Sequence, residues 1–160
     1  YEIVFGDWSS YVCSSDLSGS EGTATVSGSG AMWSSWQDLR VGYAGTGTLV
    51  IASSGQVSNA GGILGALFGS HGSATVTGSA SMWTNSLSLY LGYSGTATLL
   101  IDSGGHVSNI YGHLGTESGS HGAATVIGSG STWANSASLN VGYAGTGTLM
   151  IASGDRKSVV

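Results

Sequence analysis

The sequence predicts an all-β protein that folds as a parallel β-helix, a solenoid whose successive coils stack along one axis. VGYAGTGTL at 41–49 recurs letter for letter at 141–149, and as LGYSGTATL at 91–99. A fixed period of this size is typical of a solenoid, a propeller or an array. Within each unit apolar and polar residues alternate, as around Leu87, Leu89 and Leu91. This local period of two is typical of a strand with one buried face.

Two other all-β architectures explain the pattern less well. Three propeller blades do not close a ring, and the strands of a β-sandwich would not recur in register three times. In a β-helix of about two or more coils per unit, equivalent residues stack at about 4.8 Å per coil. We therefore expect two inward-facing columns: Val26, Val76 and Val126, and Leu49, Leu99 and Leu149.

The chain divides into five segments. Residues 1–17 do not belong to the repeat and hold the single cysteine, Cys13. Three fifty-residue repeats follow, of which the third is incomplete, and a tail breaks the pattern. Both ends resemble translated sequencing-adapter read-through, whereas the alternative is a natural cap at each end of the solenoid. We expect neither end to extend the regular coil. The repeats span 18–67, 68–117 and 118–154, and the tail spans 155–160.

Each unit carries short apolar alternations bounded by Gly, Ser or Asn, and this spacing predicts strands joined by tight turns. In the second repeat they lie within 73–83, 88–101, 105–109 and 112–115. Proline is absent from the chain, which suits continuous sheet ladders, because each proline would remove a backbone donor.

Composition excludes several function classes. Charged residues make up 7% of the chain and the net charge is −5, so a basic footprint for nucleic acid is missing. No apolar run approaches the ~20 residues that span a bilayer. The first residues, YEIVFGDWSS, lack the pattern of a signal peptide, which does not indicate the cytoplasm, because the chain looks like an internal fragment.

The repeat motif resembles the passenger-associated repeats of bacterial autotransporters, the adhesin-like proteins of type V secretion. Its two parts read ATVTGSASMW at 74–83 and SLYLGYSGTATLLIDSGGHVSN at 88–109. The resemblance covers about 18–154. It implies a right-handed β-helical passenger that is exported to the cell surface, and it does not imply a ligand. The C-terminal translocating barrel of such proteins is not in this sequence, so contact with a membrane is expected only through that missing barrel.

Titratable residues do not form a catalytic pattern. Paired carboxylates for glycoside hydrolysis must lie within about 5–10 Å of each other, and the repeat register brings no two acids together. We therefore expect no enzyme activity, no catalytic residue and no cofactor. The charged residues inside the repeats are Glu21, Asp38, Arg40, Asp102 and Glu117.

His71 and His121 occupy the same repeat position. Two coils would separate them by about 10 Å, whereas zinc ligands lie about 2.0–2.1 Å from one ion. We therefore expect exposed turn residues at these positions, and no metal site.

Two aromatic residues recur once per unit. One interpretation is a surface aromatic ladder that stacks on sugars. The other, which we favour, is structural: the Trp closes a corner of the coil and the Tyr shields a strand edge, since each aromatic buries about 150–250 Å². The residues are Trp33, Trp83 and Trp133, and Tyr43, Tyr93 and Tyr143.

The sequence as a whole predicts a fragment of a surface-displayed or secreted autotransporter-like adhesin passenger. It would serve as an extended stalk or adhesion surface, extracellular or on the bacterial cell surface. The alternatives are a fragment of a β-helical polysaccharide-processing enzyme and a purely structural matrix array. Expected partners are host-cell or matrix glycans or proteins, and not nucleic acid. The two solenoid ends also predict end-to-end self-association, because unpaired strand edges recruit other chains.

Overall fold

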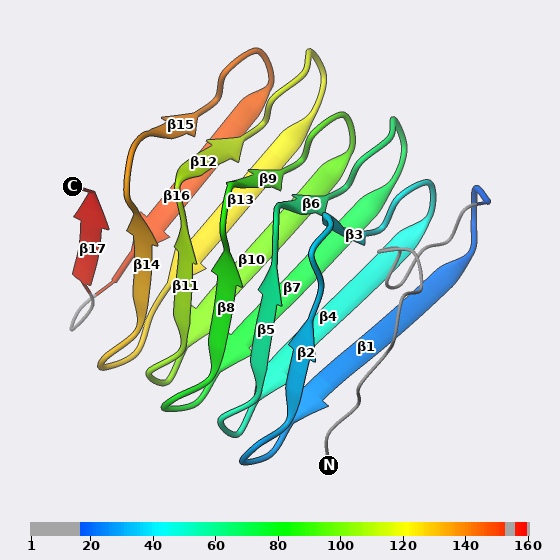
Figure 1. Ribbon diagram of the computed structural model, residues 1–160. Helices are drawn as coiled ribbons and strands as arrows, with labels where there is room; N and C mark the ends of the chain where they lie inside the picture. Colours follow the sequence, from blue (N-terminus) through cyan, green and yellow to red (C-terminus); the bar gives the residue numbers. More distant parts are fainter. Residues whose placement is uncertain (1–16, 153–155, 160) are drawn as a thin grey trace.

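The computed structural model describes residues 17–152 and 156–159, in which every regular element is a β-strand (Figure 1). The strands form three parallel sheets, here called sheets A, B and C, and each full coil contributes one strand to each sheet. The predicted all-β solenoid is therefore confirmed.

Sheet A has the longest strands: β1 (Glu21–Ser27), β4 (Thr46–Ala52), β7 (His71–Thr77), β10 (Thr96–Asp102), β13 (His121–Val126) and β16 (Thr146–Ile151). Sheet B contains β2 (Met32–Ser34), β5 (Gln56–Asn59), β8 (Met82–Asn85), β11 (His106–Asn109), β14 (Thr132–Asn135) and β17 (Arg156–Val159). Sheet C contains β3 (Leu39–Val41), β6 (Gly62–Leu64), β9 (Ser88–Leu91), β12 (Tyr111–Leu114) and β15 (Leu139–Val141).

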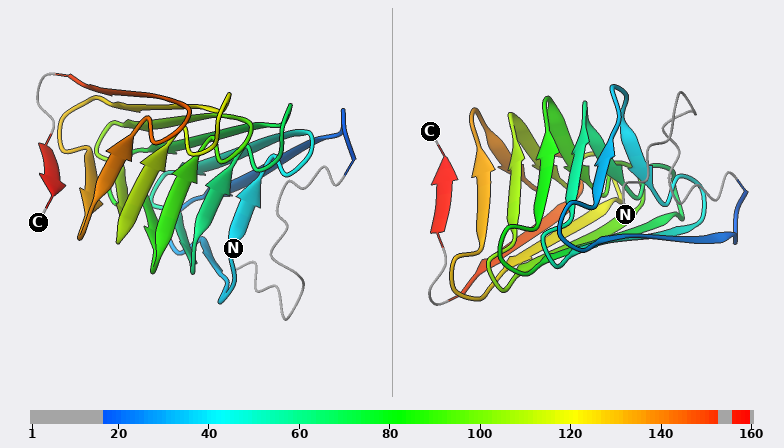
Figure 2. Two further views of the ribbon diagram at one scale, coloured as in Figure 1. Left: turned by 90° about the horizontal axis from the view of Figure 1, so that it is seen from above. Right: turned by 60° about the horizontal axis from the view of Figure 1, so that its bottom comes forward.

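One repeat makes two coils. Thr46 of β4 pairs with His71 of β7, twenty-five positions later, and His71 pairs with Thr96 of β10 after the same interval. The chain descends through sheet A at the back of Figure 1 and rises through sheet B at the front, while coils advance from right to left. In the view from above (Figure 2, left), sheet A likewise lies behind sheet B. This winding is right-handed, as parallel crossover connections almost always are.

The core is built from columns of residues that pair between neighbouring coils. In sheet A one column alternates small and large side chains, because Ala24 pairs with Leu49, and Leu49 pairs with Ala74. Small against large fills the space between coils evenly. Both predicted columns face inward, and only Leu149, in the last coil, is half-buried instead of buried. The buried members are Val26, Val76 and Val126, and Leu49 and Leu99.

The turns from sheet A to sheet B require left-handed backbone. Gly30 and Gly130 have φ of +82°, and Ala80 takes the same place in the second repeat with φ of +65°. In the alternate coils Ser53 and Ser54 have φ of +52° and +70°. These conformations cost little for glycine and more for residues that carry a Cβ.

The tail differs from the sequence-based expectation. Arg156–Val159 forms strand β17, which pairs in parallel with β14 and extends sheet B by one strand. The expectation that 155–160 does not extend the coil is therefore wrong for 156–159, because backbone pairing does not require the repeat's side chains. Residues 1–16, with Cys13, lie outside the described residues, so the corresponding expectation for the N-terminal segment stays a prediction.

Candidate functional site

The recurrent tryptophans lie inside the solenoid. Trp83 and Trp133 are fully buried, and Trp33 is half-buried against the core. The interpretation of a surface aromatic ladder is therefore wrong for Trp83 and Trp133. Both occupy the inner face of sheet B, where Trp83 pairs with the buried Val57 and Val107 of the neighbouring coils. Alternation of a large ring with valine follows the same packing rule as in sheet A.

The buried tryptophans are hydrogen-bonded to asparagines that the sequence analysis did not single out. Trp83 Nε1 donates to Asn59 Oδ1 at 2.7 Å, and Asn59 Nδ2 donates to Asn85 Oδ1 at 2.7 Å. Trp133, Asn109 and Asn135 repeat the arrangement one unit later. In the sequence these asparagines are the last residues of VSN at 57–59 and 107–109, of WTN at 83–85 and of WAN at 133–135. The polar atoms that remain buried without a partner in the described part of the chain include Nδ2 of Asn85 and of Asn135.

The recurrent tyrosines lie outside the core, on the turns from sheet C to sheet A. Tyr43 is half-buried, whereas Tyr93 is 38% and Tyr143 is 74% exposed. The guanidinium of Arg40 lies 5.6 Å from the centre of the Tyr43 ring. The structure therefore separates the two recurrent aromatics, with Trp inside and Tyr outside.

Backbone hydrogen bonds hold these turns. Tyr93 N donates to Gly65 O at 3.1 Å, and in the next unit Tyr143 N donates to Gly115 O at 3.0 Å. The glycine before each tyrosine has positive φ, and a Cβ on Gly92 would lie 2.3 Å from His121 O. The turn therefore requires glycine at this position, and the backbone hydrogen bond of the next residue fixes the starting point of each tyrosine side chain.

The outer face of sheet C adds a row of polar and aromatic side chains. Tyr90 and His113 pair across neighbouring coils, and their rings stack at 4.8 Å with an interplanar angle of 11°. Asn140 Nδ2 lies 3.1 Å from His113 Nδ1. Burial lowers the pKa of His113 from its usual value of 6.5, because the charged form is disfavoured away from water. The neutral ring can then accept this hydrogen bond through Nδ1.

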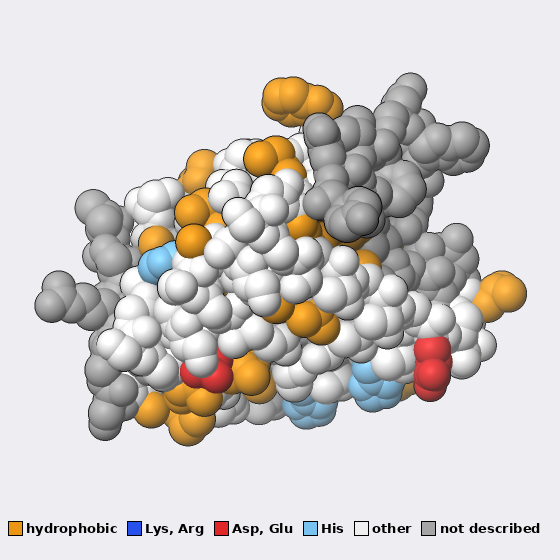
Figure 3. All heavy atoms as spheres, turned by 90° about the horizontal axis from the view of Figure 1, so that it is seen from below, with side chains coloured by type: hydrophobic (Ala, Val, Ile, Leu, Met, Phe, Trp, Pro, Cys, Tyr) orange, Lys and Arg blue, Asp and Glu red, His pale blue; other side chains and the backbone are white. Residues whose placement is uncertain are grey.

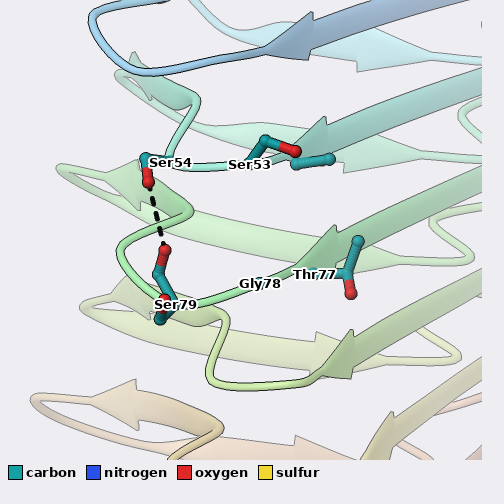
Figure 4. A pocket seen from close by; sticks show the side chains of 6 residues that line it. Ser53, Ser54, Thr77, Gly78 and Ser79 are labelled. Atoms are coloured by element: carbon teal, nitrogen blue, oxygen red, sulfur yellow. Dashed lines mark hydrogen bonds between the residues drawn. The ribbon is translucent and has the colours of Figure 1, made fainter.

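An open depression lies where sheet A turns into sheet B. Figure 3 views the molecule from the side of these turns, and most of that face carries neither hydrophobic nor charged side chains. The depression has a volume of about 390 Å³ and is lined by Ala52, Ser53, Ser54, Thr77, Gly78 and Ser79. Ser54 Oγ donates to the backbone oxygen of Ser79 at 3.3 Å (Figure 4). None of the lining residues is titratable, so the depression itself offers hydroxyls and no base to activate them.

The charged residues of the repeats are distributed over different parts of the coil. Glu21 begins β1, Asp102 ends β10, and Glu117 lies on the turn between β12 and β13. Asp38 precedes β3, and Arg40 lies within it. In residues 17–152 and 156–159, no group of three or more His, Cys, Asp or Glu side chains is arranged to hold a metal ion. His71 and His121 are both exposed, and β10 separates them in sheet A.

Comparisons with protein-family models, with curated proteins and with solved structures find no match to this chain. Among the described residues, no helix is long and apolar enough to cross a membrane.

Proposed function

We propose that the chain is a segment of a surface-displayed or secreted autotransporter-like adhesin passenger, in which the solenoid is an extended stalk whose side carries an adhesion surface. Its location would be extracellular or on the bacterial cell surface, and its partners would be host-cell or matrix glycans or proteins. The observation that supports this function best is the row of tyrosines, Tyr43, Tyr93 and Tyr143, at constant intervals outside a closed core.

The core does not need these tyrosines for its own packing, since Leu, Ile, Val, Ala and Trp side chains fill it. Exposed tyrosine is one of the residues that protein interfaces use most, because its ring offers a large contact area and its hydroxyl a hydrogen bond. A row of them along an extended surface suits adhesion better than conversion of a substrate in a pocket.

The topology also suits export as an unfolded chain. Each strand pairs only with the equivalent strands of the adjacent coils, so each coil depends on its neighbours and on no distant segment. Repeat proteins of this kind can nucleate at one point and propagate. A passenger that emerges from a membrane pore could therefore fold coil by coil outside the cell.

The test is to fuse the full 160-residue chain to an autotransporter translocating barrel and express it in a bacterium that does not adhere. We expect added protease to reach the chain on intact cells, and the cells to adhere to glycan-bearing or matrix-coated surfaces. The barrel with an unrelated passenger is the control. Export without adhesion would reduce the function to an inert stalk, and a chain retained inside the cell would contradict the proposal.

A further inference from the structure

Two exposed tyrosines and one carboxylate lie on three consecutive turns between sheet C and sheet A. Tyr93 and Tyr143 occupy equivalent places two coils apart, and Glu117 lies on the coil between them. Glu117 N donates to Tyr93 O at 2.9 Å, and Ala144 N, next to Tyr143, donates to Thr116 O at 3.2 Å. The backbone therefore fixes the order Tyr93, Glu117, Tyr143 along the solenoid axis.

The ring of Tyr93 lies parallel to that axis. Tyr90 stacks on His113 of the next coil with an interplanar angle of 11°, so the faces of the Tyr90 ring point along the axis. The Tyr93 ring makes an angle of 83° with the Tyr90 ring. The plane of the Tyr93 ring therefore runs along the axis, as stacking on a ligand parallel to the solenoid requires, whereas one face of the Tyr90 ring is covered by His113.

The spacing of Tyr93 and Tyr143 and the negative charge of Glu117 indicate which chemical class of ligand fits this row. Two coils rise about 10 Å, which is close to the length of two sugar rings in an extended β-linked chain. Aromatic faces bind the apolar faces of sugar rings, and a carboxylate accepts hydrogen bonds from their hydroxyls. Glu117 and the net charge of −5 disfavour an acidic polymer, because like charges repel.

We propose that Tyr93, Glu117 and Tyr143 bind a neutral β-linked polysaccharide whose chain runs parallel to the solenoid axis. Tyr93 and Tyr143 each stack on one sugar ring, and Glu117 accepts hydrogen bonds from hydroxyls between the two rings. This inference rests on the proposed adhesion function and names the chemical class of its ligand.

The experiment measures retardation of the full chain in native gels that contain a soluble polymer. Hydroxyethylcellulose is the neutral β-linked probe, dextran is the α-linked control, and carboxymethylcellulose has the β-linked backbone with negative charge. We expect retardation by hydroxyethylcellulose and none by dextran. Tyr93→Ala and Tyr143→Ala should each weaken binding about tenfold, as expected for the loss of one aromatic contact, and Tyr93→Phe should retain it.

Tyr111→Ala is the matched control, because Tyr111 is also exposed but begins strand β12, away from the row. Glu117→Gln should raise the binding of carboxymethylcellulose relative to hydroxyethylcellulose. Circular dichroism of each variant establishes that the fold is retained.

Absence of binding to hydroxyethylcellulose would overturn the inference, and so would equal binding of dextran or an equal loss in Tyr111→Ala. The proposed function fails separately: a chain that binds the polymer but is not exported contradicts the passenger role alone. Conversely, cells that display the chain and adhere without binding hydroxyethylcellulose contradict only the assigned ligand.

Discussion

At the scale of single residues, Trp83 joins two coils through packing and through one buried hydrogen bond to Asn59. We expect Trp83→Ala to lower the free energy of unfolding by about 3–5 kcal/mol, because it leaves a cavity in the core and removes the donor to Asn59 Oδ1. Urea denaturation followed by circular dichroism measures the change. Tyr143→Ala, at a largely exposed ring, should change it by less than about 0.5 kcal/mol. An unchanged midpoint for Trp83→Ala would contradict a structural role for Trp83.

Ala80 is one of the residues other than glycine whose backbone is left-handed. Its φ is +65°, and the equivalent residues of the other two repeats are Gly30 and Gly130. We expect Ala80→Gly to stabilise the protein by about 1 kcal/mol, because relief of the left-handed strain exceeds the entropy that glycine gains on unfolding.

Ala74→Gly serves as the control for this prediction. Ala74 is buried inside strand β7, where glycine should destabilise by roughly 0.5–1 kcal/mol. Melting temperatures of the two variants should therefore shift in opposite directions, and a fall for both would show that the turn at Ala80 is not strained.

At the scale of elements, the turns from sheet C to sheet A contain glycines that differ in the space around them. Gly92 and Gly119 both have positive φ, of +70° and +80°. A Cβ on Gly92 would lie 2.3 Å from His121 O, whereas a Cβ on Gly119 would have no atom within 4 Å. Gly119→Ala therefore measures the backbone strain alone, for which we expect about 1–2 kcal/mol.

Gly92→Ala adds a steric clash with the backbone of the next coil to this strain. We expect it to cost more than Gly119→Ala by about 1–3 kcal/mol, the range for a poorly fitting group in a packed site. Denaturation midpoints of both variants, measured side by side, give the difference. Equal costs would show that neighbouring coils move apart at this turn without resistance.

His113 of sheet C should make the free energy of unfolding depend on pH. Because burial lowers the pKa of His113, the unfolded chain binds the proton first as the pH falls. The contribution of His113 to stability is therefore complete above about pH 6.5 and is lost as the pH falls from 6.5 toward the lowered pKa. Protonation of Nδ1 also removes the acceptor that faces Asn140 Nδ2.

His113→Asn should reduce the difference between the melting temperatures at pH 7.5 and pH 5. His71→Asn, at an exposed position on the outer face of sheet A, is the control and should leave the pH dependence nearly as in the unchanged chain. A His113→Asn variant with the full pH dependence would place the responsible group elsewhere.

At the scale of the whole molecule, the sequence predicts the solenoid because a period of fifty residues and a period of two are both visible in the letters. The coil of twenty-five residues is less visible, because at several core positions the two halves of a repeat pair unlike side chains. Ala24 lies against Leu49, and Trp83 lies against Val57. At such positions neighbouring coils need complementary volumes and not identical ones, so the twenty-five-residue period repeats only some letters, such as Gly47 with Gly72 and Asn59 with Asn85.

The candidate site is predictable in part for the same reason. Recurrence identifies Trp83 and Tyr93 equally, because both return every fifty residues. Which of them faces solvent depends on the turn: the tryptophan enters sheet B on an inward position, and the tyrosine follows a left-handed glycine outside the strands. The role of the asparagines of sheet B is not predictable from recurrence, because a polar residue at the end of a strand also fits a turn.

The last coil exposes residues that are buried in every earlier one. Val141 is 45% and Ile151 is 40% exposed, although both continue inner columns of sheets C and A. Among the described strands, β15, β16 and β17 also lie at sheet edges. An apolar face with unpaired strand edges is a template for another chain. We therefore predict that the isolated 160-residue chain self-associates end to end.

Sedimentation velocity at several concentrations tests this prediction, and we expect the sedimentation coefficient to rise with concentration. Val141→Lys and Ile151→Lys together should suppress the rise, because two charges at the end of the core would have to be desolvated on contact. Met150→Lys is the matched control, since Met150 is also exposed on β16 but alternates with the inward residues and faces the side of the solenoid. A monomer at all concentrations with native circular dichroism would show that the end of the solenoid is already closed to other copies.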